Sequence, residues 1–391
     1  MNRTARLLGL TFWQWVFAIL MAGGLYSTYV RVMYGLGGAT NLNDRFPWGL
    51  WIGFDVLCGV GLAAGGFTLA AVVHIFNLER YKPIARPAIL TAFLGYVLVI
   101  VALLFDLGRP YRIWHALIMW NPRSVMFEVA WCVMLYTTVL FLEFLPAVFE
   151  RLGWRSSLKT LRAAMIPLVI LGVILSTLHQ SSLGSLYLIV PAKLHPLWYT
   201  PILPILFFIS AITVGLAMTI FESWHSSREF GRQLELPLLA GLGRVLAVSL
   251  LVYLVVRLLD LAQRGALRMA LERRTESNLF VLEICLTVLP MLLLFRRHIR
   301  WNPRALYACA VMVIFGFIAN RLNVSVTGME AGAGGRYVPR WTEVALTLSF
   351  VAAGFAVFRF AARYLPVFEQ EKQEADAAGE SERAPALTMG D

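Results

Sequence analysis

Residues 87–107 read PAILTAFLGYVLVIVALLFDL, and this stretch decides the class of fold to which the chain belongs. Asp106 is its only charged residue. An α-helix rises about 1.5 Å per residue, so about 20 apolar residues cross the hydrocarbon core of a bilayer, which is about 30 Å thick. The stretch therefore predicts a transmembrane helix.

Nine further stretches share this length and apolar character, and only 15% of the 391 residues are charged. Soluble domains carry about 25% charged residues. We therefore predict an all-α integral membrane protein with about ten transmembrane helices, a single polytopic membrane domain over residues 1–368 and a disordered polar tail over 369–391. The nine stretches are 11–34, 49–77, 124–149, 161–180, 199–224, 238–262, 277–296, 304–324 and 342–364.

The basic residues predict the orientation in the membrane. An even number of spans places both termini on one side, and that side collects 20 of the 34 Lys and Arg residues. Cytoplasmic loops are enriched in Lys and Arg. We therefore expect both termini in the cytoplasm of a bacterium, and we read the net charge of +11 as membrane anchoring rather than nucleic-acid binding.

Two halves of the chain share a pattern. Asp106 and Asp260 end the third and seventh stretches, 154 residues apart, and Glu128 and Glu283 begin the fourth and eighth, 155 residues apart. A shift of four helices preserves orientation, as in parallel repeats of membrane proteins. The pattern predicts two four-helix bundles, helices 2–5 (about 49–180) and helices 6–9 (about 199–324), flanked by helices 1 and 10.

Cysteine and histidine positions argue against metal cofactors in this chain. The four cysteines lie inside apolar stretches without the spacing of zinc or iron–sulfur ligands. A membrane b-type haem usually needs two histidines facing each other at one depth. His179 is the only histidine placed at the outer end of a span. We therefore expect no metal site, no iron–sulfur cluster and no haem.

Ionisable side chains inside membrane spans are costly and mark candidate functional sites. In the first predicted bundle such groups gather toward the outer ends of the helices, which suits proton exchange with a small polar head group. Glu128 and His179 are the candidate proton-transfer residues. The candidate head-group ligands from this pattern are Asp55, Asp106, Arg109 and Gln180.

Each candidate also has a purely structural explanation. Asp106 and Arg109 are three residues apart and could form an ion pair at a helix end. Asp55 lies among glycines on a helix that can pack closely, where it could anchor a neighbouring helix. His179 stands in a stretch rich in hydrogen-bonding side chains. Glu128 has no partner within one turn of its own helix, which favours a functional role.

Several motifs resemble the NrfD/PsrC family of membrane subunits, and most closely its ten-helix Hyb-type branch, which serves uptake [NiFe] hydrogenases. The resemblance covers residues from about 11 to 365. The motifs that carry it are FPWGLWIGFD at 46–55, DLGRP at 106–110, NPRS at 121–124, FE at 127–128, HQSSLGSL at 179–186 and HPLW at 195–198.

The resemblance implies a quinone-binding anchor without a redox cofactor of its own. Members bind a quinone, menaquinone or ubiquinone, near the outer face of the first bundle. They dock a ferredoxin-like iron–sulfur subunit that carries electrons from the catalytic subunits, here the large and small subunits of a [NiFe] hydrogenase. The family's site residues correspond here to Asp55, Tyr96, Asp106, Arg109, Glu128 and His179.

Two alternatives remain open from the sequence. The chain could anchor a molybdenum or sulfur-cycle reductase of the same family, because the identity of the partner is encoded in other chains. It could also be a secondary transporter, since parallel repeats and intramembrane charges fit that class. A transporter should carry broken helices in corresponding positions of the two halves. Proline here mostly flanks the predicted spans, as at Pro47, Pro110 and Pro196, which argues against it.

Overall fold

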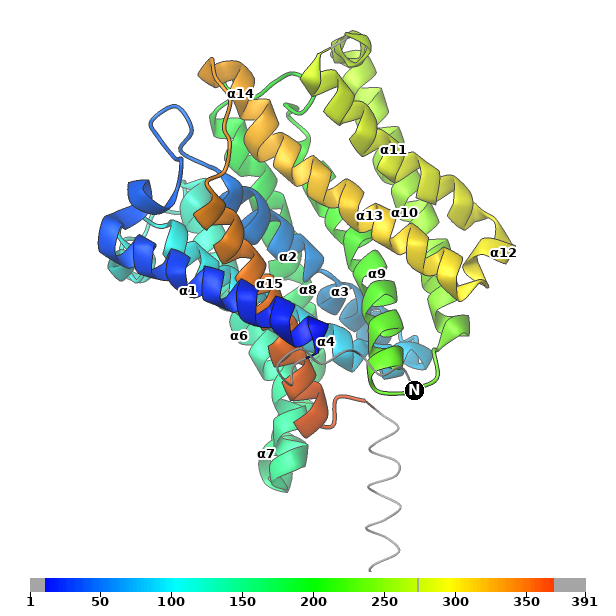
Figure 1. Ribbon diagram of the computed structural model, residues 1–391. Coiled ribbons are helices and arrows are strands. Elements are labelled where there is room, and N and C mark those ends of the chain that lie inside the picture. The colour runs from blue at the N-terminus through cyan, green and yellow to red at the C-terminus, as the bar shows by residue number, and fades with distance from the viewer. Residues whose placement is uncertain (1–10, 273, 369–391) are drawn as a thin grey trace, which may run out of the picture.

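The structure is a computed structural model that describes residues 11–272 and 274–368 (Figure 1). The predicted tail, 369–391, lies outside the described residues. Within them, ten helices are long and apolar enough to cross a membrane, which confirms the all-α class and the number of spans. The spans are α1 (Phe12–Ala39), a composite second span (Trp51–Ile75), α4 (Lys82–Asp106), α6 (Val125–Leu152), α8 (Met165–Ser185), α9 (Leu203–Glu229), α10 (Leu236–Gln263), α11 (Thr275–Phe295), α13 (Pro303–Leu322) and α15 (Trp341–Tyr364).

Shorter helical segments connect or extend these spans. They are η3 (Glu79–Tyr81), η4 (Pro110–Arg112), α5 (His115–Ile118), α7 (Arg155–Ala163), η5 (Leu186–Ile189), η6 (Ala266–Leu271), α12 (Arg297–Arg300), η7 (Asn323–Thr327) and α14 (Gly328–Ala333).

The second span is wound irregularly. It begins with the π-helical η1 (Trp51–Cys58), continues through α2 (Gly59–Leu62), turns at Ala63–Ala64, and ends with α3 (Gly65–Ala70) and the π-helical η2 (Ala71–Ile75). π-Helical turns inside α-helices occur frequently at functional sites. The small residues let α9 come close, because a Cβ atom on Gly215 would lie 2.8 Å from the backbone of Ala64.

Several spans extend further than the hydropathy pattern predicted: α1 ends at Ala39 rather than residue 34, and α9 ends at Glu229 rather than residue 224. The fifth and ninth spans continue through polar residues. The fifth was expected to end at residue 180, but α8 continues to Ser185 and then into η5. The ninth was expected to end at residue 324, but its helical path continues through η7 and α14 to Ala333. Both extensions are rich in Gly, Ser and Thr, whose side chains lower the hydropathy while the backbone remains helical.

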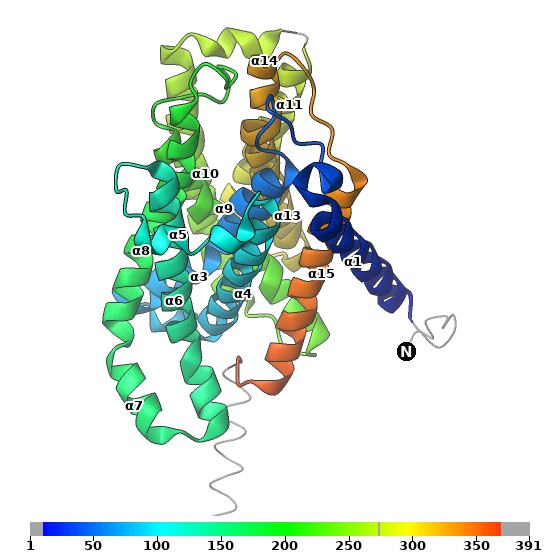
Figure 2. The ribbon, with the colours of Figure 1, turned by 90° about the vertical axis from the view of Figure 1, so that its left-hand side faces the viewer.

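Helices α1 and α15 pack against each other on one side of the molecule (Figures 1 and 2). The contact is close, since a Cβ atom on Gly24 would lie 2.2 Å from Oγ of Ser349. Elsewhere α9 packs against α3, α8, α10 and α13 and so joins the two halves of the chain. The apolar core runs through both halves, from Leu140 to Val324. The division into two bundles stays a prediction.

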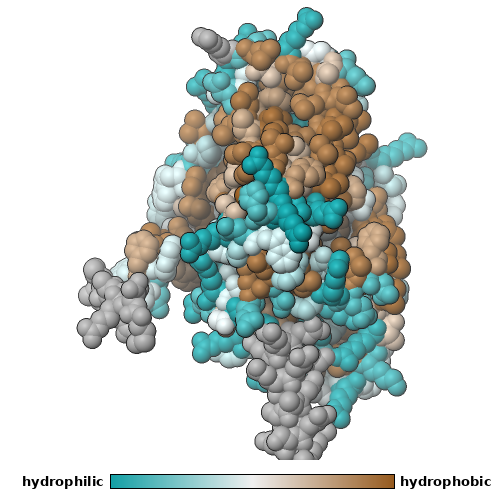
Figure 3. All heavy atoms as spheres, turned by 90° about the vertical axis from the view of Figure 1, so that its right-hand side faces the viewer, coloured by the Kyte–Doolittle hydropathy of each residue, from teal (hydrophilic) through white to brown (hydrophobic). Residues whose placement is uncertain are grey.

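The surface agrees with a membrane environment. Figure 3 shows a broad area of hydrophobic side chains over the upper part of one face, with hydrophilic side chains gathered in its middle and lower parts. On α1, large apolar side chains such as Trp13 and Leu25 are exposed. The protein is a multi-pass integral membrane protein.

Candidate functional site

Tyr96 and His179 form the centre of the candidate site. The hydroxyl of Tyr96 on α4 lies 2.8 Å from Nδ1 of His179 on α8, and both side chains are fully buried. The ring of Tyr136, on α6, packs edge-on against that of Tyr96, with centroids 4.7 Å apart. When Tyr96 donates to Nδ1, the histidine proton is on Nε2, which then points a donor into the protein.

Several buried polar atoms around this pair have no hydrogen-bond partner among the described residues. They are Nε2 of His179, Oε1 of Gln180, the hydroxyl of Tyr136 and Oγ of Ser176. Buried polar atoms are almost always paired, with protein or with water, so such a group marks a place where water or a ligand group enters. Gln180 is fixed here because its amide donates to the carbonyl of Val60, 3.3 Å away.

Glu128 lies in the first turn of α6 and is exposed. The helix begins at the cap Ser124, whose Oγ accepts from the N–H of Phe127 at 3.4 Å. Oγ of Ser182, on α8, lies 2.6 Å from Oε1 of Glu128 and 2.7 Å from the carbonyl of Leu178. A hydroxyl carries one proton, so it cannot donate to both acceptors at once. Ser182 therefore donates either to Glu128 or to Leu178, and its contact with Glu128 joins α8 to the start of α6.

His179 and Gln180 were expected at the very end of the fifth span, and that placement is wrong. Because α8 continues to Ser185, His179 is enclosed within the protein. It lies about 5 Å further along α8 than Ser182, toward the middle of the helix. Glu128 therefore lies at the exposed end of the site, and His179 lies deeper in the protein within the same site.

Asp55 and Asp106 face a different side of the second span. Asp55 accepts a hydrogen bond of 2.9 Å from the hydroxyl of Thr347, on α15. Arg31, on α1, donates to the carbonyls of Phe105 and Leu107 at 2.7 Å, and so caps the end of α4 beside Asp106. These aspartates contact the flanking helices.

The ion pair that the spacing of Asp106 and Arg109 suggested is not formed. Arg109 lies beyond the end of α4 and is exposed, and no described carboxylate lies within 4 Å of its guanidinium. The chain leaves the helix at Leu107 with extended backbone, so the three-residue spacing no longer places the two side chains on one face.

The outer-face tryptophans divide into two groups. Trp114 and Trp120 are exposed beside α5, and they remain available for docking a partner. Trp198 is buried and its indole N–H donates to Glu283 at 3.0 Å, while Trp48 packs edge-on against Tyr187. Trp198 is therefore not part of an exposed surface that could dock a partner.

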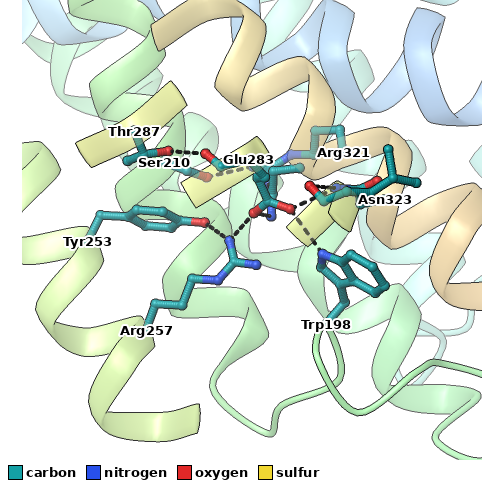
Figure 4. A network of polar contacts seen from close by, with 10 residues as sticks. Trp198, Ser210, Tyr253, Arg257, Glu283, Thr287, Arg321 and Asn323 are labelled. Atoms are coloured by element: carbon teal, nitrogen blue, oxygen red, sulfur yellow. Dashed lines mark hydrogen bonds and ion pairs between the residues drawn. The ribbon is translucent and has the colours of Figure 1, made fainter. Parts of the chain in front are cut away.

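Glu283, the counterpart of Glu128, has a very different environment (Figure 4). It is buried, and its carboxylate forms an ion pair with Arg257. It also accepts from the amides of Asn320 at 2.8 Å and Asn323 at 2.9 Å, in addition to Trp198. A carboxylate held by four donors is stabilised as the anion and serves as an anchor between helices. Only Glu128 of the two is open to an external group.

Arg257 and Asp260 are three residues apart on α10, a spacing that would favour an ion pair between them. The structure does not form this pair. Arg257 turns to Glu283, while Asp260 pairs with Arg264 at 2.6 Å and accepts from Thr200 at 2.7 Å.

Sequence reasoning missed several residues of these networks. Ser182 supplies the partner of Glu128, Thr347 that of Asp55, and Arg321 is a buried arginine stacked on Phe207, with its guanidinium carbon 3.6 Å from the ring centroid. Arg321 could have been found, because it is a charged residue inside an apolar run. Ser182 and Thr347 carry no such signal, since hydroxyls in spans commonly bond their own helix.

The described residues hold no group of three or more His, Cys, Asp or Glu side chains suited to a metal ion. The expectation that the chain carries no haem is a separate matter and stays a prediction.

Comparison with known proteins identifies the family. The profile described as "Polysulphide reductase, NrfD" matches residues 38–333. The chain is 36% identical over 360 residues to the "Probable Ni/Fe-hydrogenase 2 b-type cytochrome subunit" of Escherichia coli, covering 90% of this chain and 92% of that one. It is 28% identical over 393 residues to the "Menaquinone reductase, integral membrane subunit" of Nitratidesulfovibrio vulgaris, covering 92% of each. The similarity to the hydrogenase subunit agrees with the Hyb-type resemblance of the motifs. The chain therefore belongs to the NrfD family of membrane subunits of quinone-linked oxidoreductases.

Proposed function

We propose that this chain is the quinone-reactive anchor of a hydrogen-oxidising [NiFe] hydrogenase, passing electrons from a ferredoxin-like iron–sulfur subunit to the quinone pool. The observation that carries the proposal is the order of four residues from the surface inward, which is Glu128, Ser182, His179 and Tyr96. An exposed carboxyl in a membrane span, backed by a buried tyrosine–histidine pair, suits the transfer of protons to a lipid-soluble acceptor.

In this mechanism the quinone meets Glu128 first. A neutral Glu128 gives its proton to the reduced quinone oxygen, and its carboxylate, which is exposed, takes up a new proton from water while Ser182 stays hydrogen-bonded to it. Tyr96 orients the ring of His179 through Nδ1, and Nε2, which has no hydrogen-bond partner among the described residues, is the atom available to an incoming group. Gln180, fixed on Val60, supplies a further polar atom at the same level.

The remaining candidates act at a distance in this proposal. Asp55 accepts from Thr347 on α15, and Arg31 on α1 binds the backbone carbonyls on either side of Asp106, so these contacts hold the second span and the end of α4 in place. Arg109, exposed on the outer loop, is available to the quinone head group at the surface or to a partner subunit. Trp114 and Trp120 lie on the same loop region and support docking of the iron–sulfur subunit there.

The orientation belongs to the proposal as well. We place the chain in the bacterial inner membrane, with both termini in the cytoplasm and Glu128 toward the outer face. The Lys and Arg tally supports this orientation. The printed names of the relatives, a hydrogenase subunit and a menaquinone reductase subunit, support hydrogen and menaquinone as donor and acceptor.

A secondary transporter is disfavoured by the second half of the chain. The second span is interrupted at Ala63–Ala64, as a transporter helix can be. Its counterpart four helices later, α9, is one continuous helix from Leu203 to Glu229. Paired interruptions are the feature that inverted or parallel transporter repeats share at the substrate site.

Isolation of the native complex through a tag on this chain tests the proposal. We expect an iron–sulfur subunit and both hydrogenase subunits to be retained, and membranes that lack this chain to keep hydrogen-dependent dye reduction while losing quinone reduction. Recovery of a molybdenum or sulfur-cycle reductase would instead support the alternative anchor. Recovery of no redox partner would contradict both anchors.

A further inference from the structure

A cavity of about 490 Å³ lies between α4, α9 and α15, far from Glu128. Ligand pockets in proteins range from about 300 to 1,000 Å³. The cavity is open to the surface, and its three walls are membrane spans. It lies toward the ends at which α9 and α15 finish, the side of the chain termini.

The lining of this groove changes character along the helices. Leu98, Met218 and Val351 line its deep end, and Arg228 and Arg359 line its end nearest the helix termini. With a rise of about 1.5 Å per residue, the apolar and charged ends are roughly 12–15 Å apart. This order, from hydrocarbon to charge, matches one leaflet of a bilayer from acyl chain to phosphate.

The charged end carries one net positive charge. Arg359 pairs with Glu229 at 2.9 Å. Arg228 stacks over the ring of Trp224, 4.1 Å from its centroid, and has no carboxylate partner within 4 Å among the described residues. Arginines at the membrane surface attract anionic lipid head groups, and a guanidinium binds phosphate through parallel hydrogen bonds.

Thr91, Glu222 and His225, in the middle of the groove, already have protein partners. The hydroxyl of Thr91 donates to Glu222 at 2.8 Å, and Nε2 of His225 lies 3.0 Å from the hydroxyl of Tyr307. A quinone head group would need free donors at this depth, whereas an acyl chain needs none. The groove therefore fits a phospholipid better than a quinone.

We propose that this groove binds a phospholipid of the leaflet on the side of the chain termini. One acyl chain lies between α4, α9 and α15, and the phosphate contacts Arg228 and Arg359. The lipid fills the space between α9 and α15, which are joined at the charged end by the ion pair of Arg359 with Glu229. The proposal does not depend on the assignment of the quinone site.

Lipid analysis of the purified complex tests the proposal. The complex is washed with mild detergent, and phospholipid phosphorus and quinone are both measured per chain. Leu98→Trp fills the deep end, and Val97→Trp is its control, because Val97 is exposed on the same helix. We expect Leu98→Trp to lose one phospholipid per chain relative to Val97→Trp, with unchanged quinone.

The charged end is tested separately, with surface substitutions that leave the core intact. Arg228→Gln combined with Arg359→Gln should lower phospholipid retention on washing by a factor of ten or more, since each basic residue near a membrane contributes about a factor of five. Arg363→Gln, an exposed arginine one turn beyond Arg359, is the control and should retain the lipid.

Equal phospholipid retention in the double variant and in Arg363→Gln would overturn the proposal. So would a loss of quinone instead of phospholipid in Leu98→Trp, which would assign the groove to a quinone. Neither result would bear on Glu128, whose function is measured by electron transfer to added quinone.

Discussion

The hydroxyl of Tyr96 lies 2.8 Å from Nδ1 of His179, and the two residues join α4 to α8 inside the membrane-spanning region. Both are fully buried, and the hydrogen bond couples the orientation of the Tyr96 hydroxyl to the tautomer of His179. The pair therefore controls the direction in which His179 can donate.

Tyr96→Phe removes the hydroxyl and keeps the ring packed on Tyr136. His179 then loses its orienting partner, and a buried acceptor without a partner costs about 1–3 kcal/mol. We expect hydrogen-dependent quinone reduction to fall by at least about tenfold, within the range of positioned acid–base groups. The melting temperature should decrease slightly, and dye reduction by the catalytic subunit should be unchanged. Quinone reduction at the wild-type rate would show that the pair has a packing role only.

The Glu283 cluster should respond as a structural anchor. Glu283→Leu leaves Arg257 buried and uncompensated, and breaking a buried ion pair in this way costs about 3–5 kcal/mol. Removing both charges, with Arg257→Leu and Glu283→Leu together, should be less destabilising than Glu283→Leu alone. Thermal unfolding of the detergent-solubilised complex measures both. A double variant whose loss equals the sum of the single losses would contradict the anchor.

The chain should contain no haem. The prediction rests on the histidine positions in the sequence, because a membrane b-type haem usually needs two histidines facing each other at one depth, and His179 is the only histidine placed at the outer end of a span. The purified subunit should show no Soret band and no stoichiometric iron. A haem signal retained through purification would refute this prediction. Such a signal would agree with the name of one relative, a b-type cytochrome subunit.

The orientation can be measured with reporter fusions. A fusion at Asp391 and one near Lys193, in the loop between α8 and α9, should report opposite sides of the membrane, with Asp391 in the cytoplasm. The expectation rests on the 20 of 34 basic residues on the side of the termini. A cytoplasmic signal from Lys193 would place Glu128 on the wrong face for an external electron donor.

The sequence predicted the spans well, because hydropathy and the thickness of the bilayer fix both number and length. It failed where helices continue through polar residues. The stretch around Ser182 lowers the hydropathy of α8, yet its hydroxyls bond to carbonyls of the preceding turn and the helix continues. The same effect hid the extension of α13 beyond Asn323.

Partners across helices were beyond the reach of the sequence. The spacing of Asp106 and Arg109 suggested a pair, but a change of backbone direction at Leu107 separates them. Asp55 was grouped with Glu128 by depth, and depth alone cannot give the face of a helix in three dimensions. Thr347, nearly 300 residues away in the chain, decides where Asp55 points.

The repeat between the two halves was informative about position and misleading about chemistry. Glu128 and Glu283 match in their spacing along the chain, but Glu128 is exposed in the first turn of α6, whereas Glu283 lies about two turns into α11 and is held by four donors. The difference comes from Arg257 and the two asparagines of the ninth span, which have no counterparts around Glu128.

The central claim, that Glu128 delivers a proton to quinone, is tested most directly by Glu128→Gln. The amide keeps the shape and can still donate to Ser182, but it has no proton to transfer. Glu276→Gln, in the first turn of α11, is the control for a glutamate near the start of a span in the other half of the chain. In each variant, hydrogen-dependent reduction of quinone and of a soluble dye are measured on the same preparation.

We predict that Glu128→Gln lowers quinone reduction about 10²–10⁴-fold, with dye reduction and the subunit composition of the complex unchanged, and that Glu276→Gln keeps both activities. Quinone reduction at the wild-type rate in Glu128→Gln would contradict the account. A parallel fall in dye reduction would contradict it equally, because Glu128 would then support assembly rather than proton transfer.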